Sequence, residues 1–139
     1  MKKTGKKRII RDPLAWVHRM TGITQSQVDD IVILNRAAFS AICNGAGDFD
    51  HIGTLCGAVE TAIEMCKSGI GANVENELLD ALDAIAACQQ RGLDKGRVLF
   101  AGREIGAINE ALELHVQQLQ VATSGEILRA IAAVKARAI

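Results

Sequence analysis

Apolar residues recur three or four positions apart along most of the chain, which is the spacing of one face of an α-helix. The most regular stretch begins near His51 and ends before two closely spaced glycines. Its apolar positions are Ile52, Leu55, Cys56, Val59, Ala62, Ile63 and Cys66. The pattern predicts an amphipathic helix, with Asp50 as its N-cap and Gly69 and Gly71 at its C-terminal end.

The preceding segment predicts a long helix over residues 24–43. Thr24 and Gln27 fit a capping box at its start, and Asn44 and Gly45 break the chain after it. Its apolar residues spread around much of the helix circumference, so we expect this helix to be central in the fold. These residues are Ile31, Ile33, Leu34, Ala38 and Ile42.

Three further helices are predicted downstream. The first starts at Asn73, and residues 97–100 then form an extended connection that we expect to lie against the helices. A helix over residues 103–121 follows, and a second capping box, Thr123 with Glu126, opens the last helix. Their apolar stripes are, in turn, Val74, Leu78, Leu82 and Ile85; Ile105, Ile108, Leu112, His115 and Leu119; and Ile127, Ile131, Val134 and Ala138.

The N-terminal segment differs from the rest. Residues 1–12 are polar and carry closely spaced positive charges, which predicts a mobile basic arm. Pro13 suits the first turn of a short helix that ends at Gly22, with Asp12 as its N-cap. Because a lone tryptophan usually becomes buried, we expect Trp16 to anchor this helix on the remainder of the protein.

Composition agrees with a helical fold. The chain has 139 residues, of which 49% are hydrophobic and only 3% aromatic, so it is long enough to bury a core without disulfides. We therefore predict an all-α protein, a compact bundle of five to six helices. Residues 13–139 form a single helical domain behind the flexible basic arm of residues 1–12.

The formal net charge is zero, but positive and negative residues are separated along the chain. Residues 1–11 hold six of the sixteen Lys and Arg residues and no acid. Between residues 12 and 128, all sixteen acidic residues stand against seven basic ones, an excess of nine negative charges. We therefore expect an acidic body with basic ends.

The sequence shows no arrangement of nucleophile, base and metal ligands that would indicate an enzyme. The cysteines lack the close C-x-x-C pairs of a zinc site, and no secretory signal accompanies them. We expect reduced core thiols at Cys43, Cys56, Cys66 and Cys88. No catalytic residue, no cofactor and no metal is predicted.

Two polar positions leave alternatives open. His115 lies on an apolar stripe, and Leu112 occupies the position where a ferritin-like metal site needs Glu, so we expect a buried histidine. Asp48, Asp50 and His51 offer two carboxylates and an imidazole, which can bind a divalent cation. They lack the regular alternation of oxygen ligands found in a calcium loop.

No stretch has the apolar length needed to cross a bilayer. The basic start is also not followed by the apolar core of an export signal. The expected location is therefore the cytoplasm, without a membrane partner.

Charge leaves two functional hypotheses, with ordinary solvation of surface charge as the competing interpretation. In the first, an acidic surface binds a basic patch on a protein, including one that normally receives nucleic acid. Its residues are Glu60, Glu64, Glu75, Glu77, Asp80 and Asp83. In the second, the basic arm contacts nucleic acid weakly and the bundle is a scaffold or a homodimer. The residues of the arm are Lys2, Lys3, Lys6, Lys7, Arg8 and Arg11.

The segment RDPLAWV after a Lys-rich start, together with NEALELHVQQLQVATSGEILRAI near the end, is similar to a group of small proteins from phages, prophages and bacterial mobile elements. The matching residues are Asp12, Pro13, Leu14, Ala15, Val17, Asn109, Glu113, Leu114, His115, Gln118 and Leu119. The resemblance covers most of the chain and supplies no catalytic residue. It implies an accessory protein that binds a host protein or ribonucleoprotein complex in the bacterial cell, for example an inhibitor of a defence system like the anti-CRISPR proteins.

Overall fold

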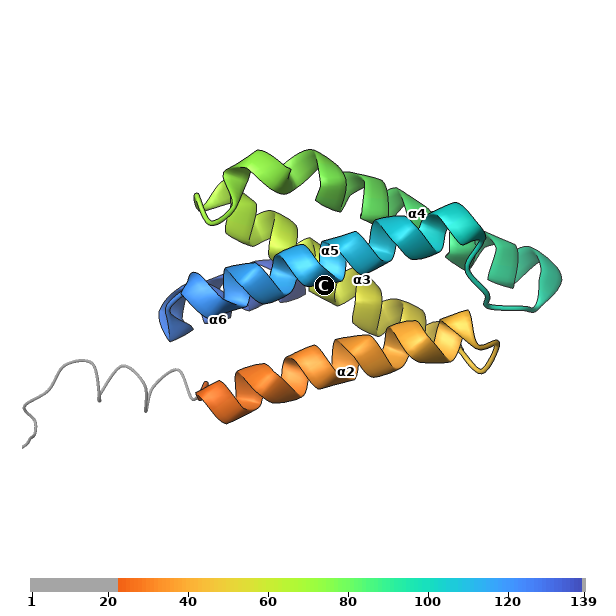
Figure 1. Cartoon of the computed structure of the whole chain (residues 1–139), viewed down its shortest axis with the longest axis horizontal. Coiled ribbons are helices and arrows are strands. Elements are labelled where there is room, and N and C mark those ends of the chain that lie inside the picture. The colour runs from red at the N-terminus through yellow and green to blue at the C-terminus, as the bar shows by residue number, and fades with distance from the viewer. Residues whose placement is uncertain (1–22, 139) are drawn as a thin grey trace, which may run out of the picture.

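The structure is a computed structural model that describes residues 23–138, and it shows a compact bundle of five α-helices and one short 3-10 helix (Figure 1). The helices are α2 (Gln25–Cys43), α3 (Phe49–Lys67), η1 (Ala72–Val74), α4 (Glu75–Lys95), α5 (Gly102–Val121) and α6 (Ser124–Ala138). The all-α prediction is therefore confirmed. The predicted arm of residues 1–12 and the predicted helix from Pro13 to Gly22 lie outside the described residues.

Helix α3 is the centre of the bundle, because α2, α4, α5 and α6 all pack against it. In Figure 1 it crosses the middle of the molecule behind α5. The prediction that residues 24–43 form the central helix is wrong. Helix α2 packs mainly against α3 and α5, and its outer residues Ile33 and Leu34 are 65% and 59% exposed. Apolar residues on several sides of a helix favour burial on all of those sides, but among residues 23–138 the neighbours of α2 are mainly α3 and α5.

Helix starts are set by local hydrogen bonds. Both predicted capping boxes are present: the amide of Gln27 donates to the Thr24 hydroxyl, and the amide of Glu126 donates to the Thr123 hydroxyl. The expected start of α4 at Asn73 is wrong, because η1 covers that position and α4 begins two residues later without a side-chain cap.

The predicted N-cap of α3 is also wrong. Asp48, not Asp50, holds that position: its carboxylate accepts from the amide of His51 at 3.1 Å, and the ring nitrogen Nδ1 of His51 accepts from the amide of Asp48 at 3.1 Å. Histidine thus takes the place that Glu or Gln usually fills in a capping box. Asp50 lies in the first helical turn, where its negative charge interacts favourably with the helix dipole.

The interior consists of two neighbouring apolar clusters. The larger one joins α2, α3, α4 and α5, and also buries Val98 and Phe100 of the connection after α4. That connection packs against the helices, as its sequence predicted, and residues 97–100 have no regular secondary structure. The smaller cluster joins the N-terminal ends of α2 and α6 to the C-terminal ends of α3 and α5. None of the described helices has the length and hydrophobicity required to span a membrane.

Candidate functional site

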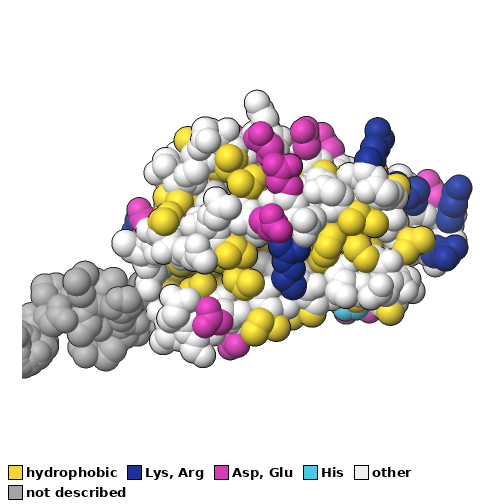
Figure 2. Space-filling model, viewed as in Figure 1, with side chains coloured by type: hydrophobic (Ala, Val, Ile, Leu, Met, Phe, Trp, Pro, Cys, Tyr) yellow, Lys and Arg dark blue, Asp and Glu magenta, His cyan; other side chains and the backbone are white. Residues whose placement is uncertain are grey.

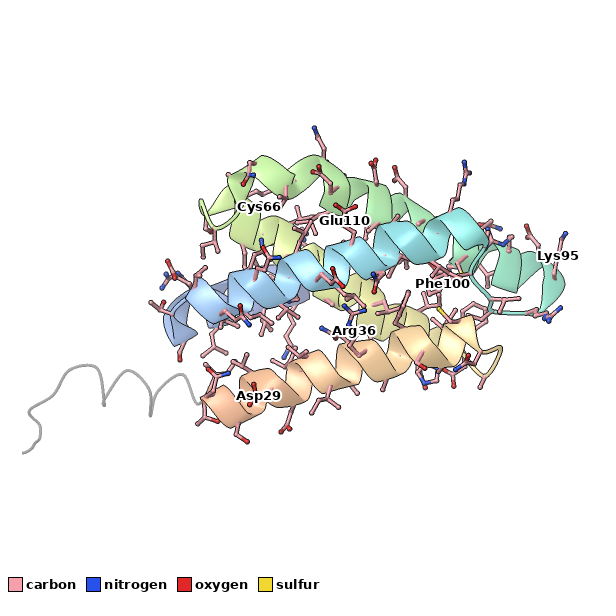
Figure 3. All side chains as sticks on the ribbon, viewed as in Figure 1. Asp29, Arg36, Cys66, Lys95, Phe100 and Glu110 are labelled. Carbon is pink, nitrogen blue, oxygen red and sulfur yellow. The ribbon has the colours of Figure 1, made fainter. Side chains whose placement is uncertain are left out.

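Three carboxylates follow one outer side of α4. Glu77, Asp80 and Asp83 are exposed and stand three residues apart, so each neighbours the next on the helix surface. Figure 2 shows acidic side chains gathered over α4 and the adjoining part of α5. Glu110 of α5, which the sequence interpretation missed, is exposed and lies on the side of its helix toward α4 in Figure 3. We call Glu77, Asp80, Asp83 and Glu110 the acidic surface.

Glu75 does not point the same way as Glu77. Residues two positions apart on a helix lie on nearly opposite sides. Glu75 approaches α3 instead, where its charge, together with the stronger effect of burial, raises the pKa of Cys66. The predicted row of α4 carboxylates is therefore divided, with Glu75 separate from the acidic surface.

The two predicted carboxylates of α3 have different surroundings. Glu64 accepts a hydrogen bond from Arg137 of α6 and lies 3.5 Å from the Nζ atom of Lys67, and its side chain is only 16% exposed. The hydrogen bond from Arg137 is the main reason that the pKa of Glu64 is lowered. Glu60 is half-buried, and its charge adds to the effect of burial in raising the pKa of Cys56. Glu64 is thus already neutralised within the protein.

A buried polar pair lies in α5. The Nε2 amide of Gln118 donates to the carbonyl oxygens of Ala62 at 3.0 Å and Ile70 at 2.9 Å, while its Oε1 atom lies 3.0 Å from Nδ1 of His115. His115 is 3% exposed, and burial lowers its pKa. The predicted burial of His115 is confirmed. Gln118 was not recognised as a core residue, because glutamine usually lies on the surface.

A partly buried ion pair closes the connection between α4 and α5. Arg91 donates to both carboxylate oxygens of Glu104, at 2.8 and 2.6 Å, and to the carbonyl oxygen of Leu99 at 3.0 Å. Glu104 also accepts from the amide of Ala101 at 2.8 Å. The bidentate bond to Arg91 lowers the pKa of Glu104. This network holds the chain where α5 begins.

The cysteine and loop candidates show no activated group. All four cysteines are free, and burial raises the pKa of each thiol. A reactive cysteine needs the opposite shift. Cys56 is half-buried rather than part of the buried stripe. Within residues 23–138, no three His, Cys, Asp or Glu side chains are placed to hold a metal ion, and Asp48 and His51 are joined in their capping box.

No family model, no curated protein and no solved structure matches this chain. The structure defines a class of protein: an all-α bundle with a carboxylate-rich outer surface on α4 and α5. The similarity to phage and mobile-element proteins stays a prediction.

Proposed function

We propose that this protein acts by binding, without catalysis, and that its acidic surface contacts a basic site on a partner protein. The observation that carries this proposal concerns Glu77, Asp80 and Asp83. All three are exposed, and none forms an ion pair with another residue in the described part of the chain. Carboxylates without an internal partner are available to steer and orient a basic partner.

The spacing of the charges suits a basic site that normally receives nucleic acid. Carboxylates three residues apart on a helix rise by about 4.5 Å from one to the next. One strand of a nucleic-acid duplex carries a phosphate charge about every 3.4 Å along its axis. The acidic surface therefore offers a linear charge density near that of a phosphate backbone, over about two turns of helix.

The partner class follows from this chemistry together with the resemblance to phage proteins. A host ribonucleoprotein complex of a bacterial defence system has basic channels for nucleic acid. An accessory protein that fills such a channel with carboxylates would inhibit the complex, as anti-CRISPR proteins do. The proposed site of action is inside the bacterial host cell.

Capture from a bacterial lysate, followed by mass spectrometry and a binding titration with the captured partner, tests this proposal. The informative variant is Asp80→Lys with Asp83→Lys. A matched control, Asp29→Lys with Asp30→Lys, makes the same change in net charge at exposed positions on α2. We expect the first variant to weaken binding by about tenfold or more and the second to leave it near the wild-type value. Equal losses in both variants, or no loss in the first, would show that the acidic surface is not the contact.

A second candidate is direct nucleic-acid binding, which the basic arm predicts. One observation within the described residues favours it: Lys95, Arg97 and Arg103 are exposed at the end of the bundle where α4 connects to α5, and dark blue side chains gather at that end in Figure 2. Nucleic-acid binding that falls steeply with salt and disappears on deletion of residues 1–11, without a captured protein, would replace the first proposal by this one.

A further inference from the structure

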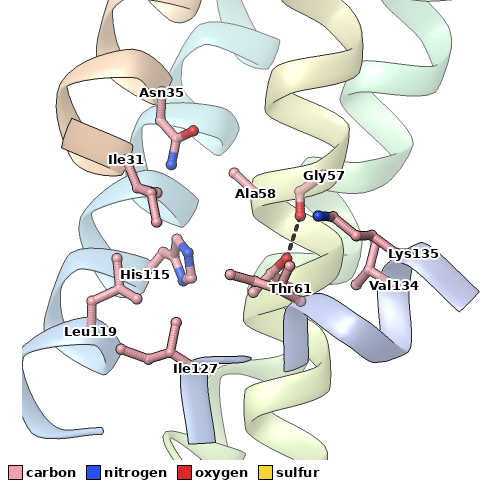
Figure 4. Close-up of a pocket in the computed structure, with 11 residues that line it drawn as sticks. Ile31, Asn35, Gly57, Ala58, Thr61, His115, Leu119, Ile127, Val134 and Lys135 are labelled. Carbon is pink, nitrogen blue, oxygen red and sulfur yellow. Dashed lines mark hydrogen bonds between the residues drawn. The ribbon is translucent and has the colours of Figure 1, made fainter. Parts of the chain in front are cut away.

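A cavity of about 240 Å³ lies where α2, α3, α5 and α6 meet (Figure 4). For comparison, an apolar cavity of about 150 Å³ in another protein holds benzene. Most of the wall is aliphatic. Its apolar side chains come from Ile31, Ala58, Leu119, Ile127, Ile131 and Val134. The cavity is on a different part of the molecule from the acidic surface, which lies on α4 and α5.

Two buried polar side chains line this apolar cavity from opposite helices. His115 of α5 is 3% exposed and Asn35 of α2 is 7% exposed, and Figure 4 shows both directed into the space between the helices. Neither the side-chain amide of Asn35 nor the Nε2 atom of His115 has a hydrogen-bond partner among residues 23–138. A third polar residue, Thr61, already donates its hydroxyl to the carbonyl oxygen of Gly57 at 2.7 Å.

The chemistry of the unpartnered imidazole nitrogen is fixed by Gln118. Because the amide nitrogen of Gln118 donates to two backbone carbonyls, its Oε1 atom is the one that faces His115. An oxygen acceptor requires a donor, so Nδ1 of the neutral imidazole carries the hydrogen. The Nε2 atom is then a lone-pair acceptor on a side chain that lines the cavity, and none of the described residues donates to it. A buried acceptor left in this condition favours a molecule that brings a donor.

We infer that this cavity is a binding site for a small, neutral, largely apolar molecule with one N–H or O–H donor, about the size of a bicyclic aromatic. The donor bonds to Nε2 of His115, the apolar body packs on the aliphatic wall, and Asn35 contacts the polar edge. A neutral molecule is favoured because Lys135 is the only charged side chain among the described residues that line the cavity, and it is exposed at the rim. A charged group placed deeper would lose its water without a counter-charge.

Two probes of nearly equal shape test the donor requirement. Indole carries a ring N–H, and benzofuran has an oxygen acceptor at the same place. In titrations of the full chain followed by protein NMR, we expect indole to bind at least about tenfold more tightly than benzofuran, with shifts at residues that line the cavity. Replacing His115→Phe keeps an aromatic ring but removes the acceptor, so it should bring the two probes to similar affinity. Equal affinity of the two probes for the wild-type protein would overturn the inference.

Two glycines of α3 provide a matched pair of variants that test whether the probe binds in this cavity. A Cβ atom added at Gly53 or at Gly57 meets no atom within 4 Å, but of the two only Gly57 lines the cavity. Gly57→Leu should fill the space and abolish indole binding, while Gly53→Leu should leave it unchanged. Gly57→Ala, which adds one methyl group and favours the helix, should weaken binding several-fold and serves if the leucine variant does not fold. Absence of saturable indole binding, or unchanged binding in Gly57→Leu and Gly57→Ala, would overturn the proposed site.

Discussion

Gln118 determines which ring nitrogen of the neutral His115 carries the hydrogen, because its Oε1 atom lies 3.0 Å from Nδ1 of His115. The orientation of the glutamine amide is itself set by α3 and the loop after it, where the carbonyl oxygens of Ala62 and Ile70 accept its two hydrogens. A single side chain thus joins α5 to α3 and orients the imidazole at the wall of the cavity, while burial lowers the pKa of His115.

Acidification should destabilise the protein through His115. Burial lowers the folded-state pKa of this histidine, whereas its pKa in the unfolded chain is about 6.5. Protons therefore bind the unfolded state first, and the free energy of unfolding falls as the pH drops below about 6.5 toward the folded-state pKa. The loss between pH 7.5 and 5.5 should reach up to about 1.4 kcal/mol in urea denaturation. His115→Asn, which retains a donor for Gln118, should flatten this dependence, and an unchanged slope in the variant would assign the effect to other groups.

Removal of the Gln118 amide should be costly. Gln118→Met keeps the chain length but leaves the part-buried carbonyl oxygen of Ile70 and the N–H of His115 without their partner, and it removes the side-chain donor to the buried carbonyl oxygen of Ala62. We expect the free energy of unfolding to fall by about 2–4 kcal/mol, since each buried polar group left unpaired costs about 1–3 kcal/mol and the site relaxes in part. Gln117→Met is the matched control, because Gln117 is exposed on the same helix. Similar urea midpoints for the two variants would contradict the assigned role.

The positions of most helices could be predicted from the sequence, because the signals that start and stop them are local. Thr24 with Gln27, and Thr123 with Glu126, bond within one turn, so their sequence spacing is enough to define a helix start. The cap of α3 was misplaced by two residues because two aspartates flank Phe49 and either suits the geometry. The two reciprocal bonds between Asp48 and His51 distinguish Asp48 from Asp50 as the N-cap.

Contacts between helices could not be predicted in the same way. From the sequence, Glu64 is expected to be an exposed carboxylate. In the folded protein it accepts a hydrogen bond from Arg137 of α6, which is 73 residues away in sequence. Glu104 likewise looks like an ordinary first-turn acid, and its burial depends on Arg91 of another helix. The apolar residues around α2 indicated a central position. The spacing of apolar residues shows which sides of a helix are apolar, but it does not show how many neighbouring helices cover those sides.

Separation of the partners in the Arg91–Glu104 pair should destabilise the connection before α5. Arg91→Met leaves the nearly buried carboxylate of Glu104 without its cation, and we expect a loss of about 2 kcal/mol in the free energy of unfolding. This is less than for a fully buried pair because Arg91 is partly exposed to water. The double variant Arg91→Met with Glu104→Met should recover part of the loss, since no uncompensated charge remains. Arg103→Met, at an exposed position nearby, is the control and should unfold close to the wild-type midpoint.

Gly47 should be the least replaceable glycine between α2 and α3. A Cβ atom there would overlap the side chain of Ile42 and lie only 2.8 Å from its Cα atom, so backbone would have to move. We expect Gly47→Ala to lower the free energy of unfolding by about 1–3 kcal/mol, as other overpacked sites do. Gly53→Ala makes the same chemical change where nothing lies within 4 Å, inside α3, and should raise stability by about 0.5–1 kcal/mol. Opposite signs in thermal denaturation are therefore expected, and a stabilising Gly47→Ala would show that the loop before α3 does not make this close approach.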